Sequence, residues 1–265
     1  MALEYHYSSV SRTECGRVRT VNEDALFASD GAGFWVVADG MGGHSAGEIA
    51  SALVVDRLKS IANSPNHAST KEQVKLSIRE ANRELRERSA ASGLKLAMGA
   101  TAAVLGTNGA QYFCLWVGDT RVYRLHANVL TQLTHDHRYV QQLVDMGALQ
   151  ADAAKTHPQR NMLTRAIGLE KDIVIDECEG IVASGDVFFV ATDGVTDVCS
   201  DDEIATMLRC QDLASAADQI VLRCTENGSP DNLSFVLIRV TNPHQQNKTQ
   251  PAETAVDAAG AFVST

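Results

Sequence analysis

Three aspartates stand at the ends of apolar runs along this chain, each beside a glycine that favours a turn. Three runs lead into Asp39, Asp119 and Asp193, and a fourth aspartate, Asp231, stands just before a final apolar run. A single Asp-Gly pair is most often an ordinary turn. Strands stacked in sheets present their ends together, so we expect acids at several strand ends to converge on one rim.

Converging carboxylates repel one another unless they take up protons or share cations. A set of oxygen ligands favours hard ions such as Mg²⁺ or Mn²⁺ over Zn²⁺. Gly40 has no Cβ, so its backbone carbonyl can approach such an ion closely. Another acidic pair, Glu23 and Asp24, opens a strand-like run at 25–27. The pattern therefore predicts a divalent-metal site, although the spacing alone leaves ordinary turns open as the alternative.

The elements that must hold these acids come in blocks of strands and blocks of helices. Uninterrupted apolar runs predict buried strands at residues 34–38, 112–117, 187–191 and 233–240. Start signals predict helices after Ser45, Thr70, Ser200 and Asp212, and a further helix is expected near 139–146. Because strands and helices do not alternate strictly, α+β layers fit better than a doubly wound parallel sheet.

The bulk composition bounds the class of protein. With 265 residues and 45% hydrophobic content, the chain can bury one large core. Its net charge of −10 argues against a nucleic-acid partner, and no apolar stretch is long enough to span a bilayer. Residues 1–11 lack the apolar run of an export signal, so we expect a cytoplasmic protein with six free thiols. From residue 242 the pattern dissolves, which predicts a folded domain at 1–241 and a disordered tail at 242–265.

Eight short motifs follow one another along the chain. They are residues 16–24 (GRVRTVNED), 37–48 (VADGMGGHSAGE), 98–101 (MGAT), 117–123 (VGDTRVY), 133–137 (LTHDH), 157–168 (HPQRNMLTRAIG), 192–197 (TDGVTD) and 228–232 (GSPDN). Together and in this order they resemble the metal-dependent protein phosphatase 2C (PPM) family in its bacterial form. The resemblance implies an α+β fold, a four-layer α-β-β-α sandwich with two central antiparallel sheets. It also implies a flap subdomain at about 137–172; the residues alone are equally compatible with an ordinary helical hairpin there.

The resemblance further implies a role for each acid. It makes Asp39 the bridging ligand of two Mn²⁺ or Mg²⁺ ions, with Asp193 and Asp231 completing the shell of one ion. A third ion, held by Asp119 together with Asp193 in bacterial members, is left open. The remaining assignments are Gly40 as a backbone ligand, Glu23 as support for the second ion and Asp24 beside the ligands.

The implied reaction is attack on phosphorus by a hydroxide that bridges the two ions. Arg19 is expected to grip the substrate phosphate through a planar, bidentate fork that lysine reproduces poorly. One residue departs from many eukaryotic members, which carry a proposed general-acid histidine where this chain has Met41. A thioether cannot donate a proton. We expect packing or loop roles for His44, His137 and His157.

The implied activity is hydrolysis of phosphoserine and phosphothreonine in proteins, opposing a bacterial serine/threonine kinase of the eukaryotic type. We expect phosphorylated proteins as partners and a monomer as the default state. The rival from another class is a catalytically weak, phosphoprotein-binding scaffold of the same fold. A two-metal nuclease is disfavoured by the acidic charge. No cysteine has the Cys-x₅-Arg spacing of a thiol phosphatase, and residues 39–43 lack the P-loop pattern.

Overall fold

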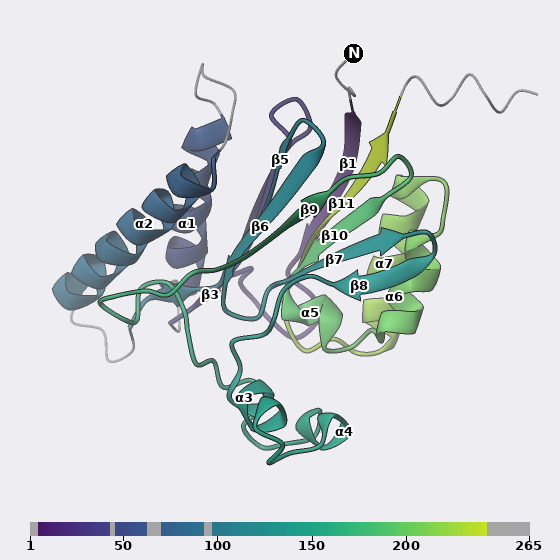
Figure 1. The fold of residues 1–265 in the computed structure, drawn as a ribbon. Helices are drawn as coiled ribbons and strands as arrows, with labels where there is room; N and C mark the ends of the chain where they lie inside the picture. Colours follow the sequence, from purple (N-terminus) through teal and green to yellow (C-terminus); the bar gives the residue numbers. More distant parts are fainter. Residues whose placement is uncertain (1–4, 43–45, 63–69, 93–96, 243–265) are drawn as a thin grey trace, which may run out of the picture.

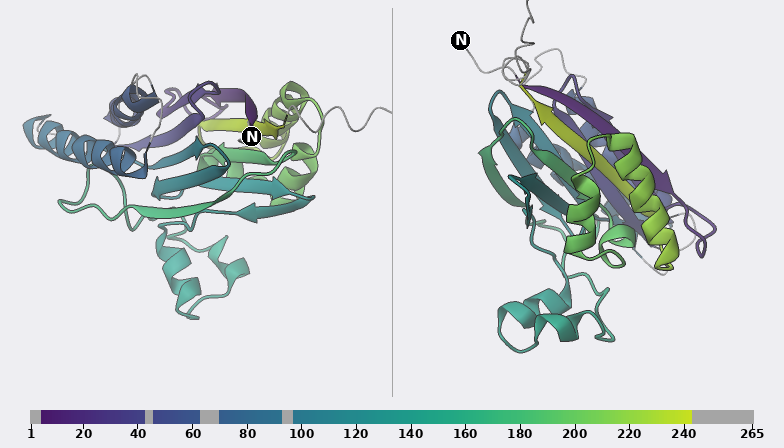
Figure 2. Two further views of the ribbon diagram at one scale, coloured as in Figure 1. Left: turned by 45° about the horizontal axis from the view of Figure 1, so that its top comes forward. Right: turned by 90° about the vertical axis from the view of Figure 1, so that its right-hand side faces the viewer.

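Two antiparallel sheets stack face to face, and helices cover both outer faces (Figures 1 and 2). The computed structural model describes residues 5–42, 46–62, 70–92 and 97–242. One sheet has the order β1-β11-β10-β7-β8. Its strands are β1 (His6–Glu14), β11 (Leu233–Thr241), β10 (Val187–Ala191), β7 (Arg121–His126) and β8 (Val129–Gln132).

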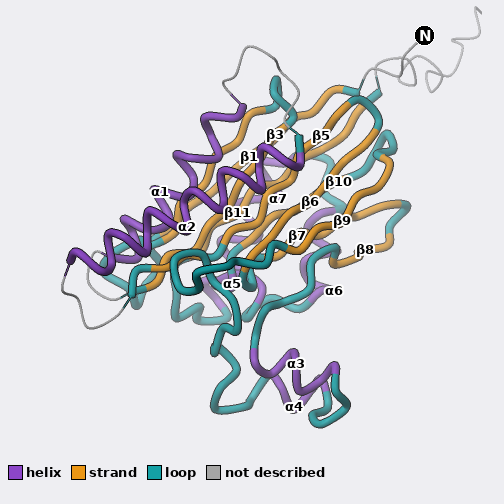
Figure 3. The backbone as a smooth tube through the Cα atoms, turned by 60° about the vertical axis from the view of Figure 1, so that its left-hand side comes forward, coloured by secondary structure: helices purple, strands orange, loops and turns teal. Residues whose placement is uncertain are grey.

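The second sheet has the order β2-β3-β5-β6-β9, and the short strand β4 pairs with β3. Its strands are β2 (Asp24–Ser29), β3 (Phe34–Met41), β5 (Ala102–Asn108), β6 (Gln111–Val117), β9 (Asp176–Ile181) and β4 (Gly99–Ala100). Helices α1 (Ala46–Ala62) and α2 (Lys71–Ser92) pack on this sheet, as the tube view also shows (Figure 3). Helices α5 (Asp193–Thr196), α6 (Asp201–Leu208) and α7 (Leu213–Glu226) cover the other sheet.

The layering follows from the alternation of side chains along each strand. In β3, Phe34 and Val36 face the helices α1 and α2, whereas Trp35 and Val37 pack between the two sheets. Both faces of this strand are therefore buried, which is why its sequence is a continuous apolar run and not an alternating one. The expected four-layer α+β sandwich with two antiparallel sheets is confirmed.

The four predicted strands and most of the predicted helix starts are confirmed. Ser200 forms a full capping box with Glu203, and the Asp212 carboxylate accepts the backbone N–H of Ser215. Thr70 and Gln73 exchange the equivalent pair of hydrogen bonds before α2. Ser45 lies outside the described residues, as does the expected tail from 243 onward.

Strand β1 is the largest element that the sequence patterns do not predict. Residues 6–14 are polar and mostly half-buried or exposed, yet all nine pair with β11. Their pairing is made by the backbone, so the side chains carry little periodic signal. Edge strand β9 also escapes prediction, because its sequence is charged and its residues are only half-buried or exposed.

Helices α3 (Tyr139–Asp145) and α4 (Ala151–Ala154) stand apart from both sheets (Figures 1 and 2). We call residues 139–162 the protruding segment. It is joined to the body by the bridge between Arg138 and Leu163. Elsewhere, all six cysteines are free thiols, as expected. In the part of the chain that the structure describes, no helix has the length and apolar character needed to cross a membrane.

Candidate active site

Strands β2 and β3 bring the first acids of the site together. Asp24 and Asp39 are register partners across this antiparallel pair. The backbone N–H of Gly40 donates to the carbonyl of Glu23 at 3.0 Å, so the pairing continues past the strand end. Three predicted residues, Glu23, Asp24 and Asp39, therefore lie side by side at one edge of the second sheet.

Two glycines make room for the Glu23 carboxylate. A Cβ on Gly40 would lie 2.0 Å from the carbonyl oxygen of Gly47 and 2.7 Å from that of Glu23. A Cβ on Gly47 would lie 2.4 Å from Glu23 Oε1. Gly47 is in the first turn of α1, and its N–H hydrogen-bonds to the Glu23 carboxyl, where the helix N-terminus favours negative charge. Only glycine fits at these two positions without moving backbone.

Asn232 ties the Arg19 loop to the start of β11. Its side-chain oxygen accepts the backbone N–H of Glu23 at 2.8 Å. Its amide group donates to the carbonyls of Cys15 and Val21 at 2.8 and 2.9 Å. Asn232 itself is buried, whereas Cys15 and Glu23 are half-buried and Val21 is exposed. Asn232 belongs to the motif at 228–232, which by itself indicates no role for it. In the structure it connects residues 15–23 to Asp231.

We expect Asn232→Ala to destabilise the fold by roughly 2–4 kcal/mol, because it removes three hydrogen bonds that hold residues 15–23 to the start of β11. Activity should fall with it, since both Glu23 and Asp231 lose their positioning. Urea unfolding measures the stability change. Asn227→Ala is the matched control: its side chain donates only one exposed hydrogen bond, to the Val198 carbonyl at 2.7 Å, and should cost about 1 kcal/mol. Equal losses in the two variants would contradict the role of Asn232.

Arg19 and Asp231 form an ion pair at the open side of this cluster. Arg19 Nη2 lies 2.7 Å from Asp231 Oδ2, and both side chains remain partly exposed. This bond occupies one nitrogen of the guanidinium, which carries five N–H donors in all. The pair places a partly exposed arginine beside the acids.

The first sheet supplies Asp193 at the end of β10, next to a hydroxyl that reaches the second sheet. Thr192 donates to Asp24 Oδ2 at 3.0 Å and accepts the backbone N–H of Ser234 at 3.0 Å. A Cβ on Gly194 would lie 1.8 Å from the carbonyl oxygen of Asn232. The turn after Asp193 is therefore packed against the segment that carries Asp231.

The electrostatics show the crowding of these carboxyl groups. Loss of hydration raises the pKa of Asp39 well above its usual value, and the charges of Asp193 and Asp24 raise it further. The pKa of Asp193 is raised well above its usual value, first by burial and then by the charge of Asp119. Burial raises the pKa of Asp24 to about 6. Such acids are stabilised by added positive charge.

The site fits an ion that keeps several of its waters, such as Mg²⁺ or Mn²⁺, better than it fits an ion whose ligands are all protein side chains. Among the described residues, no three His, Cys, Asp or Glu side chains surround one point closely enough to hold a metal by themselves. Mg²⁺ usually keeps several waters and takes only one or two carboxylates. Donors that are all oxygen atoms, together with the absence of side chains at Gly40 and Gly47, fit ions of this kind. Glu23, Asp39, the Gly40 carbonyl, Asp193 and Asp231 are the groups that would hold them.

Asp119 is buried with an unexpected partner, Arg138. Arg138 Nε lies 2.5 Å from Asp119 Oδ2, and Nη2 lies 3.0 Å from Asp193 Oδ2. Arg138 Nη1 completes the set with Asp197 Oδ1 at 2.8 Å. The structure thus brings Asp119 and Asp193 together, as predicted, but with a guanidinium between them. No sequence signal pointed to Arg138, because its three partners lie 19, 55 and 59 residues away.

Two histidines from the motifs support loops and do not face the acids. The backbone N–H of Gly118 donates to His137 Nδ1 at 3.0 Å, so Nε2 carries the proton and points it at Asp176, 3.2 Å away. His157 Nδ1 accepts the backbone N–H of Gln159 at 3.1 Å. Both arrangements agree with the expected packing roles. His44 lies outside the described residues.

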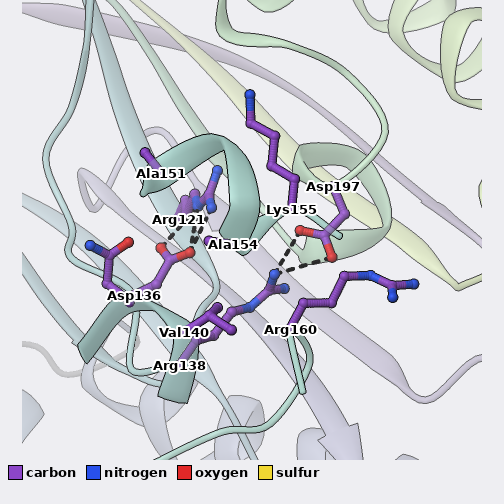
Figure 4. Close-up of a pocket in the computed structure, with 10 residues that line it drawn as sticks. Arg121, Asp136, Arg138, Val140, Ala151, Ala154, Lys155, Arg160 and Asp197 are labelled. Carbon is purple, nitrogen blue, oxygen red and sulfur yellow. Dashed lines mark hydrogen bonds and ion pairs between the residues drawn. The ribbon is translucent and has the colours of Figure 1, made fainter. Parts of the chain in front are cut away.

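A cavity of about 280 Å³ opens between the protruding segment and the body (Figure 4). Arg138 and Asp197 line one part of it, and Arg121, Lys155 and Arg160 add further positive charge. Arg121 is held by Asp136, with Nη2 2.6 Å from Oδ2. The cavity therefore adjoins the acids on the side where α3 and α4 stand.

Known proteins resemble this chain in sequence and in fold. The family model described as Protein phosphatase 2C matches residues 13–237. The serine/threonine protein phosphatase PstP of Mycobacterium tuberculosis is 32% identical over 242 residues, covering 91% of this chain and 46% of that relative. This chain therefore spans about half the length of that relative. The serine/threonine phosphatase stp of Listeria monocytogenes is 32% identical over 235 residues, covering 86% of this chain and 93% of that relative.

Among solved structures, the catalytic domain of PstP in complex with two manganese ions superposes with a TM-score of 0.82 at 28% identity. The match covers 90% of this chain and 100% of that chain.

Proposed function

Because this chain belongs to the protein phosphatase 2C family, we propose that it is a metal-dependent phosphatase of phosphoserine and phosphothreonine in proteins. The observation that carries the proposal is the convergence of Glu23, Asp39, Asp193 and Asp231 beside a partly exposed arginine. Loss of hydration and mutual repulsion raise the pKa of Asp39, which favours bound divalent cations at this edge of the sheets.

Each group has a distinct part in the proposed reaction. When bound, two Mn²⁺ or Mg²⁺ ions make a water acidic enough to attack phosphorus and offset charge on the phosphoryl oxygens. Asp39 would contact both ions, with the Gly40 carbonyl beside it. Asp193 and Asp231 would complete one ion's shell and Glu23 would serve the other. Asp24 would stand beside the ligands: it is the register partner of Asp39 and accepts the hydroxyl of Thr192, which links the two sheets.

Arg19 would orient the substrate phosphate. Its ion pair with Asp231 leaves further guanidinium N–H groups facing the open side of the site, where non-bridging oxygens can accept them. The leaving serine or threonine oxygen needs a proton, and Met41 cannot supply one. A water molecule is the donor that the exposed rim of the site allows.

Phosphorylated proteins, among them a serine/threonine kinase or its targets, are the proposed substrates, and the cytoplasm is the proposed location. The oligomeric state proposed is a monomer. Six free thiols are typical of a reducing compartment. The protruding segment at 139–162 is the proposed flap within the range 137–172, because loops and short helices beside a rigid scaffold often select substrates.

The direct test is hydrolysis of an aryl phosphate and of a phosphothreonine peptide, with Mn²⁺ and with excess chelator. We expect turnover with Mn²⁺ and a return to background with chelator, restored when Mn²⁺ is added back. Turnover that survives chelation would contradict the metal mechanism. Binding of the phosphopeptide without turnover would instead support the catalytically weak scaffold.

Mn²⁺ should also raise the melting temperature, because an ion that binds only the folded protein stabilises it by mass action. The free energy of unfolding should rise by about 2.7 kcal/mol when free Mn²⁺ is one hundred times its dissociation constant. Differential scanning fluorimetry across a Mn²⁺ titration measures it, with Ca²⁺ as a comparison ion. A melting temperature that does not respond to Mn²⁺ argues against a folded-state metal site.

A further inference from the structure

Arg138 lies where the family resemblance leaves room for a third divalent ion. Each of its three guanidinium nitrogens faces a different carboxylate, on Asp119, Asp193 and Asp197. Nε and Nη2 share one edge of the planar guanidinium, so Asp119 and Asp193 are joined side by side through that edge. An ion bound between these two acids would have to occupy the space that the two N–H groups fill.

Burial makes this arginine a fixed part of the site. Only 7% of the Arg138 side chain and 5% of the Asp119 side chain are exposed. Burial by itself disfavours the charged guanidinium, but the carboxylates of Asp119 and Asp197 outweigh it, so the pKa of Arg138 is raised and the side chain stays charged. Breaking such a buried pair leaves an uncompensated charge, which is strongly destabilising.

The surroundings oppose displacement of Arg138 by a metal ion. The space into which the side chain would have to turn is the cavity between body and protruding segment (Figure 4). Three further cationic residues, Arg121, Lys155 and Arg160, already line that cavity. Of the two acids that line the cavity, Asp136 is already paired with Arg121 and Asp197 already pairs with Arg138, so a displaced guanidinium would meet repulsion from the other cations and gain no new carboxylate there.

The backbone of Arg138 places it at the root of the protruding segment. It precedes α3, and its carbonyl accepts the first-turn N–H of Gln142 at 3.2 Å. An antiparallel bridge joins it to Leu163 at the far end of the same segment. The side chain thus links this root directly to the acids of the site.

We propose that Arg138 is a built-in cation that replaces a third divalent ion, so that this protein binds two ions and not three. The inference rests on the proposed two-ion site. It makes Arg138 a positioning residue that neutralises Asp119 and orients Asp193 towards the ions.

The test is the number of Mn²⁺ ions bound per chain, measured by equilibrium dialysis with metal analysis and by anomalous diffraction from Mn²⁺-soaked crystals of the full chain. We expect two ions in the wild type and none between Asp119 and Asp193. Arg138→Met should gain an ion there and bind three. Arg160→Met is the matched control: it removes an arginine from the same cavity, contacts none of these acids and should keep two ions.

Asp119→Asn keeps the inference testable if Arg138→Met does not fold. If Asp119 binds only Arg138, this variant should still bind two ions, whereas loss of a third-ion ligand would lower the count by one. Three ions in the wild type, or two in a folded Arg138→Met, would overturn the inference while leaving the phosphatase activity intact. No bound ion in the wild type would overturn the proposed function and the inference with it.

Discussion

Asp39→Asn should lower kcat/KM for a phosphothreonine peptide by about 1000-fold in saturating Mn²⁺. Asp39 is the one acid proposed to contact both ions, and the charge stabilisation that such ions supply is worth several kcal/mol, with each 1.36 kcal/mol equal to tenfold in rate. Asparagine has the same shape but no charge, so strands β2 and β3 should keep their register.

The same substitution should stabilise the protein when metal is removed. Asp39 has a raised pKa in the fold, so the folded state holds a proton more tightly than the unfolded chain does. Wild-type stability in chelator should therefore fall as the pH rises above about 4, by up to about 1.4 kcal/mol per pH unit until Asp39 ionises in the fold. Asparagine does not ionise, so the variant should not lose stability in this way. Its stability relative to the wild type should therefore increase as the pH rises above about 4.

Steady-state kinetics and urea unfolding in chelator at pH 5 and pH 7 measure the two effects. Asp56→Asn is a suitable control, because Asp56 is an exposed acid on helix α1 and lies outside the site. A folded Asp39→Asn with wild-type turnover in Mn²⁺ would refute the proposed metal role.

Arg19→Ala should lower kcat/KM by about 100-fold while leaving Mn²⁺ affinity unchanged or slightly stronger. Charge-assisted hydrogen bonds to phosphate contribute about 1.5–3 kcal/mol, which is lost with the guanidinium. The second effect follows from the ion pair with Asp231, since removing a cation 2.7 Å from that carboxylate favours the approach of another.

The kinetics of Arg19→Ala should be compared with those of Arg19→Lys and with Mn²⁺ titrations of each. Lysine keeps the charge but not the planar fork, so we expect it to recover only part of the loss. Arg12→Ala is the control, since Arg12 pairs with Asp218 on the surface at 2.7 Å. If Arg19→Ala weakened Mn²⁺ binding and the Mn²⁺ dependence accounted for the lost activity, Arg19 would be a support for the metal site and not a phosphate ligand.

The parts of the fold that the sequence predicts are those with strong local signals. Strands β3 and β10 are buried on both faces, so their apolar runs identify them, and the Ser200–Glu203 capping box marks the start of α6. Strand β1 escapes because it is held by backbone bonds to β11, more than 200 residues away. A polar strand of this kind is specified by its partner and has no pattern of its own.

The residues of the site likewise differ in whether the sequence predicts them. The convergence of Asp39, Asp193 and Asp231 is predictable, because acids in glycine-containing turns next to strands are visible in the sequence. Arg138 is not, because an arginine just before a helix resembles any surface arginine until the fold places Asp119, Asp193 and Asp197 around it. Asn232 is an intermediate case. Its motif is recognisable in the sequence, but its three backbone partners can be identified only in the folded structure.

The pairing of β1 with β11 makes the folded protein depend on the last described strand to be synthesised. Strand β11 lies between β1 and β10 in its sheet, yet it is the last of the described strands to be synthesised. Until this end of the chain leaves the ribosome, β1 has no strand to pair with, the Arg19 loop has no Asn232 to hold it, and Asp193 lacks Asp231. Long-range pairings of this kind form late in folding. A nascent chain should therefore bind Mn²⁺ weakly and hydrolyse nothing, and activity should begin only when residues 233–241 have been released.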